Sequence, residues 1–166
     1  MKVVVTDVSV LFDLFEVKVL QEFFALKWEI YTTDFVYNEI IQTDQKEAFE
    51  TFRGNHRLKI LSFTTDEVRA VQNFKTNLSI RSIADKTILW KALQMQSILL
   101  TCDDKLRREA EVHSIEVHGS IWVIEQLVVN GIAKKAEGIC LLEELKTTNS
   151  RLPIDIIDNL IRNWKK

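Results

Sequence analysis

The feature that most constrains the fold is an apolar run near the start of the chain that ends on a carboxylate. Val3, Val4 and Val5 occupy successive positions and are followed by Thr6 and Asp7. Because successive residues of a strand point to opposite faces, this run predicts a strand that is buried on both sides. Such strands occur in parallel sheets covered by helices, where ligands bind outside the carboxyl ends of the strands. Asp7 is expected at that end.

The first 118 residues alternate short apolar strands with helices. Further strands are predicted near residues 29–32, 58–62, 97–101 and 115–117. Helices are predicted near 10–27, as two short helices, and near 33–41, 44–54, 65–75, 82–95 and 104–113. This alternation predicts a mostly parallel sheet between layers of helices. The remainder predicts helices only, near 120–130, 135–147 and 153–164. We therefore expect one domain over residues 1–166, with an α/β core over 1–118 and C-terminal helices over 119–166.

Composition narrows the classes of function. The chain has 166 residues, of which 46% are hydrophobic, and this balance favours a folded globular protein over a disordered one. The formal net charge of -2 is not the basic footprint of a stoichiometric nucleic-acid binder. Two cysteines, no visible signal peptide and no apolar run of membrane-spanning length favour a soluble cytoplasmic protein.

Four acidic side chains are the candidates for chemistry. Asp7 and Asp103 follow apolar strands, whereas Glu39 and Asp85 lie on predicted helices beside apolar residues. Taken singly, the strand-end aspartates could cap helices, and the other two could offset a helix dipole or face solvent. Taken together, carboxylates that meet in one crevice repel one another, and a divalent cation relieves this repulsion. Oxygen-only ligands suit Mg²⁺ or Mn²⁺ rather than zinc.

Other chemistry is sparse in the sequence. The three histidines fit no zinc-site spacing, and no glycine-rich phosphate loop, Walker lysine or serine elbow is present. Cys102 is expected to be a buried structural thiol. Lys105, Arg107 and Arg108 follow the last candidate acid, where they could contact nucleic-acid phosphates or form a solvated helix face.

The acidic motifs, taken in order, resemble those of PIN-domain nucleases. Four segments carry the resemblance: residues 4–9 (VVTDVS), 33–40 (TDFVYNEI), 82–85 (SIAD) and 99–106 (LLTCDDKL). The ordered set, within residues 2–118, is more specific than any single motif. The tail from Gly119 onwards is similar to a subgroup of bacterial and archaeal PIN proteins with extra C-terminal helices.

The resemblance implies a fold and an activity. The fold would be a parallel sheet of about five strands sandwiched by helices. The activity would be that of a Mg²⁺- or Mn²⁺-dependent endoribonuclease, in which the cation activates a water for attack on the phosphodiester. The residues that would bind metal and carry catalysis are Asp7, Glu39, Asp85 and Asp103.

The resemblance also implies supporting residues around these acids. Ser9 and Thr101 would orient the carboxylates through their hydroxyl groups. Asp103 and Asp104 are adjacent in the sequence, and the Thr-x-Asp register favours Asp103 as the ligand, with Asp104 beside it.

Partners follow from the same resemblance. Many relatives are toxins of toxin–antitoxin pairs, which implies an RNA substrate, an antitoxin protein as a partner, and a homodimer. Two other functions stay open. A non-catalytic RNA- or protein-binding module would keep the fold without cleavage. A phosphotransfer or phosphatase domain would want a second acid two residues after Asp7, where this chain has Ser9.

Overall fold

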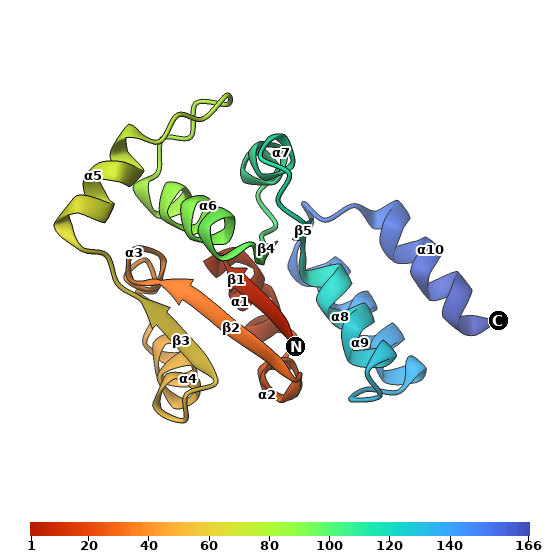
Figure 1. Cartoon of the computed structure of the whole chain (residues 1–166). Helices are drawn as coiled ribbons and strands as arrows, with labels where there is room; N and C mark the ends of the chain where they lie inside the picture. The colour runs from red at the N-terminus through yellow and green to blue at the C-terminus, as the bar shows by residue number, and fades with distance from the viewer.

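The computed structural model describes all 166 residues and contains one parallel sheet of five strands (Figure 1). The strands are β1 Lys2–Thr6, β2 Trp28–Thr33, β3 Leu58–Leu61, β4 Ile98–Leu100 and β5 Val117–His118. Their order in the sheet is β3-β2-β1-β4-β5. The predicted doubly covered strand is confirmed, because β1 lies at the centre and its Val4 and Val5 are fully buried.

The strand order places the start of the chain at the point where the direction of winding reverses. From β1 the chain proceeds outward to β2 and β3, and then returns to the other side of β1 with β4 and β5. Thr6 is in register with Leu100, whose carbonyl accepts the Asp7 N–H at 2.8 Å. Ligands of open α/β sheets bind outside the carboxyl ends of the strands at such a switch point. Asp7 lies directly at this point.

Ten helices connect and cover the strands. They are α1 Val8–Glu16, α2 Leu20–Ala25, α3 Asp34–Tyr37, α4 Thr43–Gly54, α5 Thr65–Asn73, α6 Ile83–Met95, α7 Asp104–Val112, α8 Ser120–Val129, α9 Lys135–Thr148 and α10 Ile154–Lys165. None of them combines the length and the apolar character that a membrane-spanning segment requires.

The helices form two layers with separate cores. Helices α3, α6 and α7 share a buried cluster with Val5 and Leu99 of the central strands. A larger buried cluster on the other side of the sheet joins α1, α2, α4, α8, α9 and α10 to Val4 and Leu100. Figure 1 shows α8, α9 and α10 beside the β4–β5 side of the sheet. The predicted three-layer α/β/α architecture is therefore confirmed.

The region 10–27 forms two short helices, as predicted, and most other bounds differ by one or two residues, but two elements depart further from the prediction. Helix α3 ends at Tyr37, so the prediction that it reaches residue 41 and contains Glu39 is wrong. The Glu39 N–H donates to the carbonyl of Val36, three residues back, and this tightened turn ends the helix. The last strand lies at Val117–His118 rather than at residues 115–117, because Ile115 packs into the core beneath the helices instead.

Candidate active site

A cleft of about 770 Å³ opens at the carboxyl ends of β1 and β4. Seven carboxylates line this acidic cleft: Asp7, Asp13, Glu16, Glu39, Asp85, Asp103 and Asp104. Its only basic lining residues are Lys105 and Arg151. The four predicted acids therefore face one cleft, although no group of three or more His, Cys, Asp or Glu side chains is placed so that it could hold a metal ion.

Asp7 is the most firmly held of these acids. Its side chain is buried, and Oδ1 accepts the Val8 N–H at 2.7 Å. Oδ2 accepts the hydroxyl groups of Ser9 at 2.6 Å and of Thr101 at 3.0 Å. Burial raises the pKa of Asp7; the three hydrogen bonds oppose this rise, and the nearby charge of Asp103 adds to it. Asp7 is thus a fixed carboxylate at the base of the cleft.

The same two hydroxyl groups connect β1 to the loop after β4. The Ser9 hydroxyl accepts the Cys102 N–H at 3.1 Å, and the Thr101 hydroxyl accepts the Asp103 N–H at 3.1 Å. Each hydroxyl therefore donates to the Asp7 carboxylate and accepts from the backbone of the neighbouring loop. This arrangement fixes the distance between the two acid-bearing strand ends.

Removing one of these hydroxyl groups gives a first prediction. Thr101→Val keeps the shape of a fully buried side chain but removes its hydrogen bonds to Asp7 and Asp103. We expect a loss of about 1–2 kcal/mol of unfolding free energy, measured by denaturant titration. We also expect any catalytic activity that depends on Asp7 to fall roughly 10- to 100-fold, because the carboxylate loses its orienting partner.

Thr32→Val is the matched control for this substitution. Thr32 is equally buried, but its hydroxyl donates to the Thr6 carbonyl at 2.8 Å and not to a carboxylate. It should lower stability by a similar amount and leave the activity of the folded protein nearly unchanged. Equal activity losses in the two variants would contradict an orienting role for Thr101.

Asp85 lies in the first turn of α6, and its carboxylate accepts no hydrogen bond from the protein. Its pKa is raised to about 6, first by burial and then by the charges of the other three predicted acids. An acid in the first turn of a helix is otherwise favoured by the helix dipole. Here burial and the repulsion from neighbouring carboxylates outweigh the opposing charge of Lys105, so the Asp85 carboxylate is only partly compensated in the cleft.

Glu39 reaches the cleft from the turn after α3, not from the helix itself. Its side chain is largely exposed. Partial burial raises its pKa, and the charge of Asp7 raises it further. The sequence left open that Glu39 is a solvated residue at the edge of the apolar face. Its side chain is indeed exposed to solvent, but it is also close enough to Asp7 to be affected by that charge.

Asp103 caps a helix, as one interpretation of the sequence expected, and its carboxylate also lines the cleft. Its Oδ1 accepts the Leu106 N–H at 2.7 Å and so caps α7. Its charge also raises the pKa of Asp7 and of Asp85. Asp104 lines the cleft as well, but its charge is not among those that raise the pKa of these two acids.

Asp13 was not predicted from the sequence as a site residue. Its side chain is buried and accepts hydrogen bonds from the Ser120 hydroxyl, from the Cys102 thiol at 3.3 Å and from the Asn149 side-chain amide at 2.9 Å. These contacts join α1 to the start of α8 and to the end of α9. Burial, followed by the charge of Asp13, raises the pKa of the Cys102 thiol to about 12, which agrees with a structural thiol.

The sequence does contain a pattern that could have indicated Asp13 as a site residue. Ser9, Asp13 and Glu16 stand at positions i, i+4 and i+7 of the otherwise apolar helix α1. This spacing places them on one face, and all three line the cleft. A polar stripe on an apolar helix therefore marks the side of α1 that faces the site.

The side chains in the cleft fit a hard divalent cation. All four predicted ligands are carboxylates, and the charge of Asp85 has no protein donor to compensate it. Mg²⁺ commonly binds through one or two protein carboxylates and keeps several waters, so three converging ligands are not required. A cation between these acids would also lower the repulsion that raises their pKa values.

Comparisons with known proteins identify the family of this chain. A family model described as a PIN domain matches residues 3–166. A PilT N-terminus domain protein from the hyperthermophilic archaeon Sulfolobus solfataricus has a similar structure, with a TM-score of 0.49 and 9% identity over 76% of this chain and 93% of that one.

A domain of a functionally unknown protein from Methanocaldococcus jannaschii is also similar, with a TM-score of 0.45 and 20% identity over 72% of this chain and 91% of that one. A search of curated proteins found no match. The family match extends over nearly the whole sequence, and on that ground the chain belongs to the PIN-domain family, whose members are generally nucleases.

Proposed function

We propose that this chain is a metal-dependent endoribonuclease that hydrolyses RNA phosphodiester bonds in the acidic cleft. Mg²⁺ or Mn²⁺ would be held by Asp7, Glu39, Asp85 and Asp103. The observation that carries the proposal is the state of Asp85, a carboxylate without a protein donor and surrounded by three others. Such a group is costly for the fold unless it binds a cation.

The chain's own residues would have distinct tasks. The three donors to Asp7 leave its carboxylate little freedom, so this residue would set the position of the site. Burial and the charge of Asp7 raise the pKa of Glu39, and a cation held beside Glu39 would relieve this repulsion. When bound, the cation supplies positive charge that activates water and stabilises the developing charge on the phosphate.

A toxin role is a further part of the proposal. It rests on the resemblance to PIN-domain toxins and places the protein in the cytoplasm, as a homodimer with an antitoxin partner. Light scattering on the purified protein tests the dimer directly. Growth arrest on induced expression, relieved by the Asp85→Asn substitution, tests the toxin role.

The nuclease proposal is tested by incubating the purified protein with mixed-sequence single-stranded RNA, with DNA of the same sequence as a second substrate. Reactions contain Mn²⁺ or a chelator, and Asp85→Asn is run in parallel. We expect RNA cleavage that requires the metal and is lost in the variant. Cleavage that is independent of metal, or equal in the wild type and in Asp85→Asn, would contradict the proposal.

The alternative is a non-catalytic module that binds RNA or protein. The absence of a ready three-ligand group in the cleft favours this alternative. It predicts that the folded, metal-loaded protein cleaves none of several RNAs and that any RNA binding is independent of metal.

A further inference from the structure

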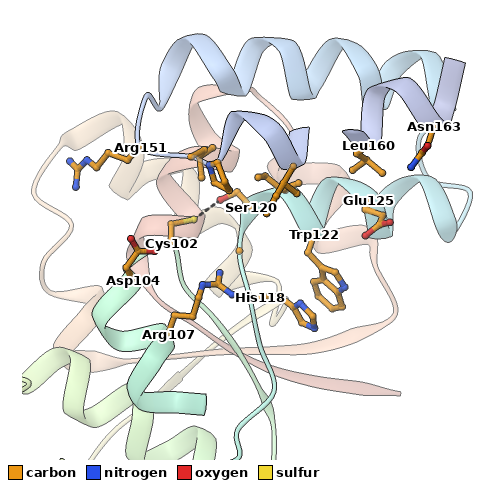
Figure 2. Close-up of a pocket in the computed structure, with 15 residues that line it drawn as sticks. Cys102, Asp104, Arg107, His118, Ser120, Trp122, Glu125, Arg151, Leu160 and Asn163 are labelled. Carbon is orange, nitrogen blue, oxygen red and sulfur yellow. Dashed lines mark hydrogen bonds between the residues drawn. The ribbon is translucent and has the colours of Figure 1, made fainter. Parts of the chain in front are cut away.

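A second cavity, of about 540 Å³, adjoins the acidic cleft (Figure 2). It lies between α7, β5 and α8 on one side and the loop before α10, together with α10 itself, on the other. Four residues line both the cavity and the cleft: Cys102, Asp104, Arg151 and Leu152. The two spaces therefore lie side by side, and these four residues border both of them.

A fixed cation lines this cavity. The Arg107 guanidinium donates to the backbone carbonyls of Thr101 at 3.1 Å and of Val117 at 3.3 Å, and it makes no salt bridge. A side-chain carbon at Gly119 would lie 3.1 Å from the Arg107 Nη2 atom, so the glycine leaves room for this group. A guanidinium has five N–H donors, so donors remain for an anion.

The positive charge of Arg107 matters because the neighbouring cleft is strongly acidic. The acidic cleft has seven carboxylates against two basic side chains, and the whole chain has a formal net charge of -2. A phosphate strand would be repelled by such a cleft and needs cations close to it. Arg107 in the cavity and Arg151 at the junction supply them, and neither side chain is paired with a carboxylate.

The rest of the cavity suits a nucleobase. Ile121, Pro153, Ile156 and Leu160 provide apolar surface, and Asn163 provides a polar edge. Figure 2 shows Arg107 extending from α7 toward the start of α8, with Leu160 and Asn163 of α10 across the cavity. The Trp122 ring already stacks on His118 and on Trp28, so a base would pack on the aliphatic side chains. The volume lies within the range of small-ligand sites.

From these contacts we infer that the cavity is a nucleotide subsite for the RNA strand whose scissile bond lies in the acidic cleft. The inference rests on the proposed ribonuclease function. The phosphate of a flanking, unpaired nucleotide binds Arg107, and Arg151 contacts the phosphate between the cavity and the cleft. The base is buried against Ile156 and its apolar neighbours, as unstacked bases of single-stranded RNA commonly are.

The subsite is tested with two substrates of different length. A short single-stranded RNA reaches both spaces, whereas bis(p-nitrophenyl) phosphate is a small diester that occupies the cleft alone. Arg107→Gln and Arg151→Gln should each lower kcat/KM for the RNA roughly tenfold, as expected when one charge-assisted hydrogen bond is lost. Arg107→Gln should leave hydrolysis of the small diester unchanged, because Arg107 lines the cavity and not the cleft. Arg151 is exposed, so its variant is the safer one for folding.

Arg162→Gln is the matched control, because this exposed arginine also lies in the C-terminal region but outside the cavity. It should cleave both substrates as the wild type does. Equal losses on both substrates for Arg107→Gln, or RNA cleavage unchanged in both cavity variants, would overturn the subsite.

A binding measurement separates this inference from the nuclease proposal. Fluorescence anisotropy with labelled RNA in the presence of Mg²⁺, using the Asp85→Asn background, requires no cleavage. Removing Arg107 or Arg151 should reduce the slope of log affinity against log salt by about 0.7, the value for one phosphate contact on a single strand. Ile156→Ser should weaken binding of intact RNA but not of an abasic strand. If the wild type cleaves no RNA but the arginine variants show this change in salt dependence, the subsite stands and the nuclease proposal fails. If the salt dependence is the same in the variants and in their parent protein, the subsite is overturned, whatever the nuclease activity.

Discussion

Asp85→Asn should lower RNA cleavage on the order of a thousandfold and, at the same time, stabilise the metal-free protein at neutral pH. The loss of activity follows from removing a half-buried cleft carboxylate that accepts no hydrogen bond from the protein and whose pKa is raised by the charges of three other acids. It is a cleaner test than Asp7→Asn, because Asp7 accepts three hydrogen bonds that also hold the fold.

The gain in stability has a defined dependence on pH. The pKa of Asp85 is 3.8 before folding shifts it and about 6 in the folded protein. Between these values the folded state binds more protons than the unfolded state, so stability falls as pH rises through this window and is level above it. After allowing for partial exposure and for the lost helix-dipole interaction, the variant should gain about 1 kcal/mol at pH 7 and almost nothing at pH 4.

Asp66→Asn is the control for this pair of measurements. Asp66 is an aspartate in the first turn of α5, with only an exposed ion pair to Arg69. The substitution should leave cleavage unchanged and should not stabilise the protein at any pH. If Asp85→Asn keeps activity, or if its melting temperature falls below that of the wild type at pH 7, the picture of a repelling acidic cluster is wrong.

Much of the fold could be predicted from short sequence patterns, because strands and helices form through interactions between residues that are close in the sequence. The unbroken Val run identified the central strand, and strand–helix alternation identified the parallel sheet. Asp7 and Asp103 could be expected near one another because both follow strands, and the carboxyl ends of parallel strands share one edge. For these residues, position along an element was enough to indicate position in space.

The rest of the site depends on contacts between distant parts of the chain. Glu39 reaches the cleft through a turn that ends α3 early, and helical periodicity carries no information about that turn. Asp13 meets Asn149 across 136 positions, through the way α9 packs beside α1. The same packing brings Arg151 to the rim of the cleft. Because nothing local distinguishes Asn149 or Arg151 from ordinary loop residues, the sequence alone assigns no role to either.

A divalent cation should stabilise the folded protein strongly, because only the folded state brings the carboxylates together. At a Mn²⁺ concentration one hundred times the dissociation constant, binding adds about 2.7 kcal/mol to the unfolding free energy. For a chain of this size that corresponds to a rise of about 5–10 °C in the melting temperature, measured by calorimetry or fluorescence. The rise should be reversed by a chelator.

Low pH and the Asp85→Asn substitution should both reduce the rise in melting temperature on cation binding, because each removes the negative charge of Asp85. At pH 5, below the pKa of about 6 of Asp85, protons compete with the cation, so the shift in melting temperature should be clearly smaller than at pH 7.5. In Asp85→Asn the shift should fall to half or less at both pH values, whereas Asp66→Asn should retain it. An equal shift in wild type and Asp85→Asn would mean that the cation binds elsewhere, and it would leave the acidic cleft without the partner that its repelling charges require.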